Sequence, residues 1–158
     1  MKIVNTNGMD WQYWDSPGGK FKMYGKEISE ALGRDAASTD IMLRHPFDVE
    51  IQRIPAGTAA TVYHAHSAQW EFYHIISGSG TVRHDGGTEP IKAGDAFVFK
   101  PRESHQIVAG DEELVMYVVA DNPIGEHHYY PDSGKWGVSL PERRLMRGEP
   151  LDYFEGEE

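Results

Sequence analysis

Short β-rich runs separated by turn residues dominate the middle of this chain, from Phe47 to Asp121. The seven runs read VEIQRIPAG, TAATVYHAH, WEFYHIISGSG, GTVRHDGG, DAFVFKP, SHQIVAG and ELVMYVVAD. Regularly spaced short strands of this kind are typical of all-β sandwiches and barrels. The segments between them are too short to hold the helix that joins two parallel strands, which disfavours a parallel sheet. The sequence therefore predicts an all-β sandwich or barrel.

The two flanks have a different character from this middle region. The N-terminal arm, residues 1–46, clusters aromatic residues around a Ser-Pro-Gly-Gly turn and contains KEISEALGRD, which predicts a short helix ending near Gly33. The C-terminal tail, residues 122–158, is rich in turn residues and ends in the acidic EGEE. We expect a single domain over residues 1–158, with a barrel core at about 47–121, an arm at 1–46 and a loop-rich tail at 122–158.

The composition of the chain narrows the classes of molecule that it is expected to bind. The 158 residues carry a formal net charge of −10, which repels nucleic acid and anionic membranes. The N-terminal MKIVNTNGMDWQYW lacks the apolar core of a signal peptide, and no apolar run reaches membrane-spanning length. We expect a cytoplasmic protein whose partner is a small molecule, with no nucleic acid and no membrane involved.

A cluster of potential metal ligands lies within the strand-rich region. His64 and His66 are two residues apart, so they project from the same side of a strand, and Glu71 opens the next run. His105 follows a proline-containing turn and begins a later strand. Because the chain has no cysteine, a metal must be held by His, Asp or Glu. Three imidazoles and one carboxylate suit one divalent ion, and Mn, Fe, Ni, Cu and Zn all stay open.

Several other residues could have either a functional or a purely structural role. Tyr73 shares the parity of Glu71, so it is a weak catalytic candidate, although an inward tyrosine more often fills a barrel. His127 and His128 are adjacent and point opposite ways in an extended chain; we expect a solvated loop there rather than ligands. Arg53 could receive an anionic group or form a surface salt bridge. The expected core residues are Val62, Ile75, Phe97, Phe99, Val115, Tyr117 and Val119.

These residues fall in a recognisable order along the chain. The pattern Gly57, His64-x-His66, Glu71 and Gly78 resembles the first motif of the cupin superfamily, and Gly94, Pro101 and His105 resemble the second. The flanking phrases also resemble small single-domain bacterial cupins of uncharacterised function. The resemblance implies a double-stranded β-helix, the cupin jelly-roll barrel, with His64, His66, Glu71 and His105 as metal ligands.

The chain departs from the two motifs in two places. One extra residue separates Gly57 from His64, and Arg102 stands where a glycine usually follows the proline. Arg102, like Arg53, could bind an anion or be salt-bridged at the surface.

The motifs leave the activity open, because one fold serves many reactions. We expect a metal-dependent enzyme acting on a small oxygenated molecule, of the dioxygenase, decarboxylase or isomerase type. The alternative is a non-catalytic module that binds or senses a small ligand. We also expect a homodimer, because the aromatic arm and the outward-facing Phe72 and Ile76 leave more apolar surface than a monomer usually exposes.

Overall fold

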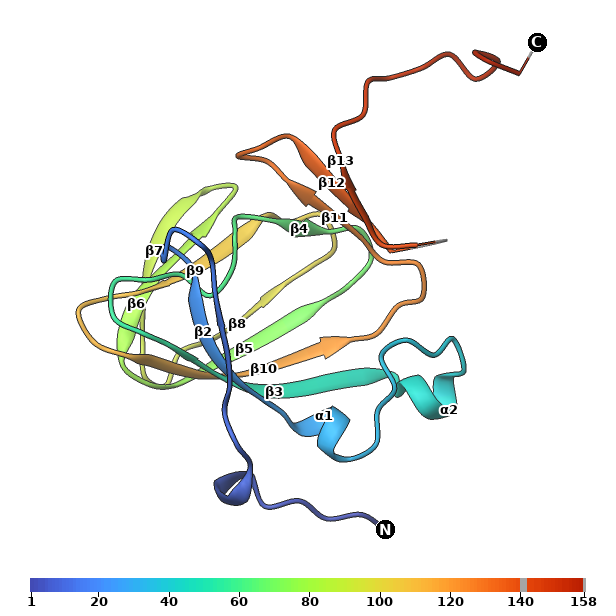
Figure 1. Ribbon diagram of the computed structural model, residues 1–158. Helices are drawn as coiled ribbons and strands as arrows, with labels where there is room; N and C mark the ends of the chain where they lie inside the picture. Colours follow the sequence, from blue (N-terminus) through green and yellow to red (C-terminus); the bar gives the residue numbers. More distant parts are fainter. Residues whose placement is uncertain (140–141, 158) are drawn as a thin grey trace.

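The computed structural model describes residues 1–139 and 142–157, and short strands make up most of it (Figure 1). The helical segments are single turns: η1 (Thr6–Gly8), α1 (Ile28–Ala31) and α2 (Ile41–Arg44). The strands are β1 (Gln12–Asp15), β2 (Lys22–Glu27), β3 (Phe47–Ile54), β4 (Ala65–His66), β5 (Glu71–Ser77), β6 (Ser79–His84), β7 (Gly87–Lys92), β8 (Ala96–Phe99), β9 (His105–Ala109), β10 (Leu114–Asp121), β11 (His127–Tyr130), β12 (Lys135–Val138) and β13 (Arg144–Met146).

Three antiparallel sheets build the barrel. A six-stranded sheet, in the order β1-β2-β3-β10-β5-β8, faces a three-stranded sheet, β7-β6-β9. A four-stranded sheet, β13-β12-β11-β4, lies at one end of these two (Figure 1). The prediction of an all-β jelly-roll barrel is confirmed by this arrangement. No helix in the described ranges is long and apolar enough to cross a membrane.

The N-terminal arm adds two strands to the barrel's own sheet. β1 pairs with β2, and β2 pairs with β3, so the arm continues the six-stranded sheet at its edge. The ring of Trp11 is covered by Lys26, whose Nζ lies 4.5 Å from the ring centroid, and by the Arg53 guanidinium at 4.7 Å. Phe72 and Ile76 stay exposed on the outer face of β5. The homodimer therefore stays a prediction.

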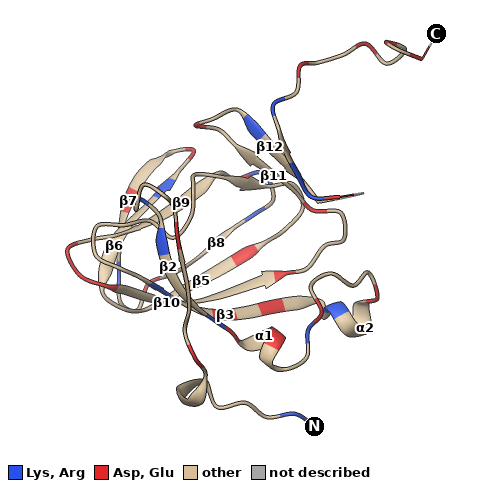
Figure 2. Ribbon diagram, in the orientation of Figure 1, with Lys and Arg blue, Asp and Glu red and all other residues tan. Residues whose placement is uncertain are grey.

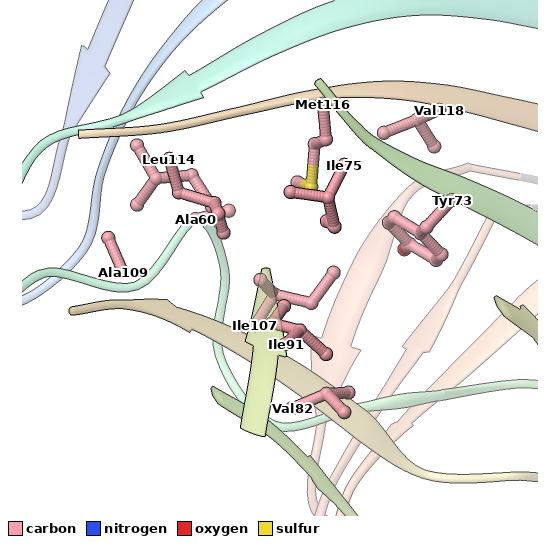
Figure 3. Close-up of a cluster of buried hydrophobic side chains, with 11 residues drawn as sticks. Ala60, Tyr73, Ile75, Val82, Ile91, Ile107, Ala109, Leu114, Met116 and Val118 are labelled. Atoms are coloured by element: carbon pink, nitrogen blue, oxygen red, sulfur yellow. The ribbon is translucent and has the colours of Figure 1, made fainter. Parts of the chain in front are cut away.

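The hydrophobic core fills the space between the sheets (Figure 3). Ile54, Ile75, Leu114 and Met116 are fully buried at its centre, and Phe97 and Phe99 pack against it as expected. The further members are Ala60, Tyr73, Val82, Ile91, Ile107, Ala109 and Val118.

The prediction for the inner face of β10 was wrong. The buried residues are Leu114, Met116, Val118 and Ala120, whereas the expected core residues Val115, Tyr117 and Val119 are only half-buried on the other face. Both faces of this strand are apolar, so the alternation of residues along the sequence cannot show which face is buried. The pairing of β10 with β3 and β5 determines which side chains point into the barrel. Val62 is also only half-buried and lies outside the core cluster.

Gly78, in the turn between β5 and β6, is required by a close backbone approach. It has a φ of 81°, and a Cβ placed there would lie 2.1 Å from the carbonyl oxygen of Glu113. Only glycine can meet both conditions without strain.

The C-terminal tail contains more strand than its turn-rich sequence predicts. β11, β12 and β13 form an antiparallel meander, and β11 pairs with β4, which carries one of the candidate ligands. Beyond β13 the chain runs away from the barrel (Figure 1). The pairing of β11 with β4 brings part of the tail to the mouth of the barrel.

Candidate metal centre

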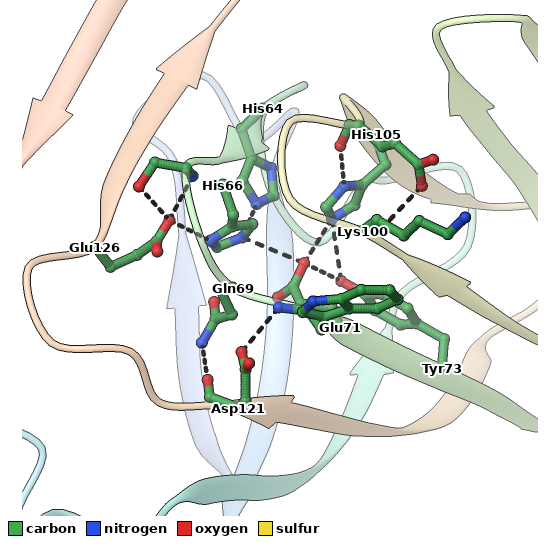
Figure 4. A network of polar contacts seen from close by, with 12 residues as sticks. His64, His66, Gln69, Glu71, Tyr73, Lys100, His105, Asp121 and Glu126 are labelled. Carbon is green, nitrogen blue, oxygen red and sulfur yellow. Dashed lines mark hydrogen bonds and ion pairs between the residues drawn. The ribbon is translucent and has the colours of Figure 1, made fainter.

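Strand ends bring the four predicted ligands together inside the barrel (Figure 4). His66 ends β4, Glu71 begins β5 and His105 begins β9. His64 and His105 face each other across a two-way backbone bridge, with N–O distances of 3.1 and 2.8 Å. One ligand atom from each of the four residues lies within 4.8 Å of all the others.

The donor atoms that converge are three imidazole nitrogens and one carboxylate oxygen. The Nε2 atoms of His64 and His66 are 3.0 Å apart. Oε2 of Glu71 lies 2.7 Å from Nε2 of His105 and 3.2 Å from Nε2 of His66. Three neutral nitrogens and one anionic oxygen at these spacings form a donor set that fits a first-row divalent ion.

The second nitrogen of each histidine explains why Nε2 points inward. Nδ1 of His64 lies 2.8 Å from the carbonyl oxygen of Val62, and Nδ1 of His105 lies 3.2 Å from that of Glu103. A carbonyl can only accept, so each Nδ1 donates to it, and each ring is thereby turned with Nε2 toward the cluster. Metal-binding histidines are commonly oriented by such acceptors.

Charge in the cluster is unevenly distributed. Burial, with the nearby His105, lowers the pKa of His64 to about 3, so its ring is neutral. Burial also opposes a charge on His66, but the neighbouring carboxylates of Glu126 and Glu71 outweigh burial and raise the pKa of His66 to about 9. For Glu71 burial is outweighed in the same way by His105 and His66, which hold its pKa well below the usual value.

The sequence did not point to Glu126, which is buried beside the cluster. Its carboxylate accepts hydrogen bonds from the backbone N–H of Ser67 at 2.7 Å and of Ala68 at 3.1 Å. Its Oε1 lies 3.5 Å from Nδ1 of His66, an ion-pair distance that exceeds a good hydrogen bond. Glu126 therefore fixes the loop after β4 and supplies the anion that faces the second nitrogen of His66.

The expectation of a solvated loop at His127 and His128 was wrong. Both lie in β11, and His128 pairs directly with His66 on β4, with ring centroids 4.8 Å apart. His66, Glu126 and His128 form a second group of possible ligand atoms next to the first. Adjacent strand residues do point opposite ways, so only His128 faces the cluster.

Tyr73 lies against the cluster, as its parity predicts. Its hydroxyl donates to Oε2 of Glu71 at 3.0 Å and lies 3.3 Å from Nε2 of His105. Burial, together with the Glu71 charge, raises its pKa well above the usual value. Tyr73 is therefore a neutral phenol that orients Glu71 through a hydrogen bond, and its raised pKa makes it a weak acid.

A cavity of about 260 Å³ opens beside the donor atoms and has a second acidic group in its wall. Glu50 and Gln52 of β3 line it, and the Gln52 side-chain amide donates to the Glu50 carboxylate. Figure 2 shows the acidic residues that β3 and β5 carry. Glu27 is the register partner of Glu50 on β2, and burial together with the charge of Glu27 raises the pKa of Glu50 well above the usual value. The Glu50 carboxyl beside the donor cluster therefore keeps its proton to a higher pH than an ordinary glutamate does.

The remaining candidates lie away from the donor atoms. Arg53 pairs with Glu113 at 2.8 Å on the partly exposed side of β3, which favours its surface role. Gln69, at the barrel mouth, donates to the carbonyl oxygen of Asp121 at 2.6 Å, and the backbone N–H of Trp70 donates to the Asp121 carboxylate at 2.8 Å. Both residues brace the loop between β4 and β5. Arg102 lines a different cavity, on the outer side of β4.

Comparison with known proteins bears on the barrel. Residues 50–120 match the family model described as the cupin domain. A curated oxalate-binding protein from Thermotoga maritima is 36% identical over 55 residues, which are 35% of this chain and 45% of that protein; the match thus spans about half of the relative's length.

Solved structures resemble the fold over nearly the whole chain. A candidate sugar phosphate isomerase from Acidithiobacillus ferrooxidans superposes with a TM-score of 0.79 at 21% identity, covering 95% of this chain and 96% of that one. A sugar phosphate isomerase of the cupin superfamily from Silicibacter pomeroyi gives 0.75 at 21% identity, covering 96% and 98%. At these identities the likeness shows a shared fold.

Proposed function

We propose that this chain, whose residues 50–120 match the cupin domain, binds one divalent metal ion through His64, His66, Glu71 and His105. The supporting observation is the convergence of three imidazole nitrogens and one carboxylate oxygen within 4.8 Å inside the barrel. The acceptors at Nδ1 of His64 and His105 add to it, since they orient both rings with Nε2 toward the cluster.

We further propose that the centre belongs to an enzyme that acts on a small oxygenated molecule. A bound metal of this type polarises a substrate oxygen and orients the substrate. The chain's own contribution is a cavity of about 260 Å³ that Glu50, a carboxyl of raised pKa, lines together with the donor cluster. An acid or base beyond the ligands is what isomerase or decarboxylase chemistry needs, and Glu50 is better placed for proton transfer than the high-pKa phenol of Tyr73.

The alternative function is binding without catalysis. The partial similarity to an oxalate-binding protein supports it, because a small dicarboxylate could occupy a metal centre of this kind without reacting. Under this alternative Glu50 would only hold the cavity wall together with Gln52.

Metal analysis of untagged protein tests the proposed ligands. The double change His64→Ala and His66→Ala should abolish stoichiometric metal, because it removes two of the four donors. The matched control is His74→Ala, which removes a histidine from β5 that directly follows Tyr73 and lies on the opposite face from Glu71. Full metal content in the double variant would refute the site.

Activity separates the two proposed functions. Metal-loaded protein should turn over at least one member of a panel of sugars, diketones and small carboxylic acids, and Glu50→Gln should lower kcat while metal content stays the same. Saturable binding of oxalate without turnover of any panel member, unchanged in Glu50→Gln, would favour the binding module.

A further inference from the structure

Arg102 has an unusual backbone conformation. It lies in the loop between β8 and β9 with a φ of 75°, in the left-handed region that a residue with a Cβ adopts only at a cost in free energy. Its backbone N–H donates to the carbonyl oxygen of His66 at 2.7 Å, which ties the loop to β4. Glycine would meet the same geometry without strain, so the arginine side chain is present here at a conformational cost.

The side chain of Arg102 lines a cavity of about 400 Å³ on the outer side of the four-stranded sheet. Ala65, Tyr129 and Trp136 are direct cross-strand partners on β4, β11 and β12, so they share one face of that sheet. His66 and His128 form the next cross-strand pair and face the donor cluster on the opposite side. The two cavities are therefore separated by β4, and His66 borders both.

The walls of this outer cavity combine apolar surface with polar groups. Tyr129 and Trp136 pack with ring centroids 4.6 Å apart and present apolar surface. Arg102 is exposed at the cavity, and within residues 1–139 and 142–157 the buried Nδ1 of His127 has no hydrogen-bond partner. Ser104 adds a hydroxyl. Ligand sites typically combine apolar walls with a few polar groups in this way, and the volume is in their usual range.

We propose that this outer cavity is a second ligand site, which binds a small aromatic carboxylate. The ring lies against Tyr129 and Trp136, and the carboxylate pairs with Arg102, whose planar guanidinium can donate two parallel hydrogen bonds. A local cation is needed because the net charge of −10 otherwise repels anions. The site does not depend on the metal centre, from which β4 divides it.

Binding of three probes to metal-free protein, in the presence of chelator, tests the proposal. Benzoate and phenylacetate should bind with a Kd on the order of 1 mM by calorimetry and ligand-observed NMR, as suits ligands of this size. Benzamide, which has the ring without the charge, should bind more weakly. Arg102→Gln should weaken benzoate binding about tenfold, because it removes the charge and keeps the backbone conformation.

Two glycine variants distinguish the effect of relieving backbone strain from the effect of removing the Arg102 side chain. Arg102→Gly and His45→Gly each replace a residue of positive φ, and His45, with a φ of 60°, lies outside the cavity. Neither variant should melt at a lower temperature than the parent chain, because glycine relieves the backbone. Only Arg102→Gly should lose benzoate affinity.

Several results would overturn the proposal. They are the absence of saturable benzoate and phenylacetate binding, equal affinity for benzamide, or unchanged affinity in Arg102→Gln. If Arg102→Gln instead changes the particle mass in light scattering and benzoate does not bind, the cavity is an interface between copies of the chain. Because every measurement uses metal-free protein, failure here leaves the metal proposal standing.

Discussion

Replacing Glu126 by glutamine should weaken metal binding without removing a ligand. The carboxylate holds the N–H groups of Ser67 and Ala68 at 2.7 and 3.1 Å and faces Nδ1 of His66 at 3.5 Å. A glutamine offers one accepting oxygen, so its NH₂ must face either Ala68 N–H or the protonated Nδ1 of His66. One charge-assisted contact is lost, and the His66 ring is less firmly oriented.

The expected magnitude follows from these contacts. Losing an acceptor that orients a metal-binding histidine typically costs about 10- to 100-fold in affinity, or roughly 1.4–2.7 kcal/mol. The free energy of unfolding of the metal-free protein should fall by about 1–2 kcal/mol, because one hydrogen bond to a charged group is lost. Competition with a chelator of known affinity gives the first quantity, and urea denaturation gives the second.

The matched control for this change is Glu113→Gln. Glu113 is also an ion-paired carboxylate, but its partner is Arg53 at 2.8 Å, away from the cluster. Its loss should leave metal affinity unchanged and cost at most about 1 kcal/mol of stability. Metal affinity of Glu126→Gln within about twofold of the parent chain would refute the orienting role. Complete loss of metal would show instead that Glu126 is itself a ligand, with His66 and His128.

The other predictions concern backbone, protons, metal and assembly. Gly78→Ala should lower the free energy of unfolding by at least about 3 kcal/mol, because φ is positive there and the new Cβ would lie 2.1 Å from a carbonyl oxygen. Gly134→Ala, at a φ of 59° with open space around it, should lower it by only about 1 kcal/mol, and denaturant unfolding measures both. Metal binding at neutral pH should release a proton, because the pKa of His66 is about 9 in the metal-free chain and ligation needs the neutral ring. Metal affinity should therefore rise with pH up to about 9. Calorimetry in two buffers of different ionisation enthalpy measures the proton release, and its absence would contradict this prediction. Chelator should leave the β signal in circular dichroism intact at room temperature, because the core does not include the metal ligands; loss of that signal would mean that the metal holds the fold. Light scattering at micromolar concentration should give twice the chain mass of 17.8 kDa, and the mass of a single chain would exclude the homodimer.

Local sequence signals were sufficient for the barrel, and they pointed to the histidines and the glutamate that the structure brings together. Short strands with turn residues between them can bury their apolar faces only in a sandwich or barrel. The regular spacing of strands and turns is visible in the sequence, so it predicts this architecture. The spacing of His64 and His66 places both side chains on one face of any extended segment. With no cysteine in the chain, nitrogen and carboxylate oxygen were the remaining donors.

Tertiary structure decided what depends on register between strands far apart in the chain. β10 is apolar on both faces, so only its pairing with β3 and β5 made Met116 inward and Tyr117 outward. Glu126 and His128 reach the cluster only because β11 pairs with β4. The raised pKa of Glu50 likewise comes from its burial in the barrel and from Glu27 on another strand. Such contacts join residues whose separation in sequence carries no periodic signal, so their positions follow from the packing of the whole barrel.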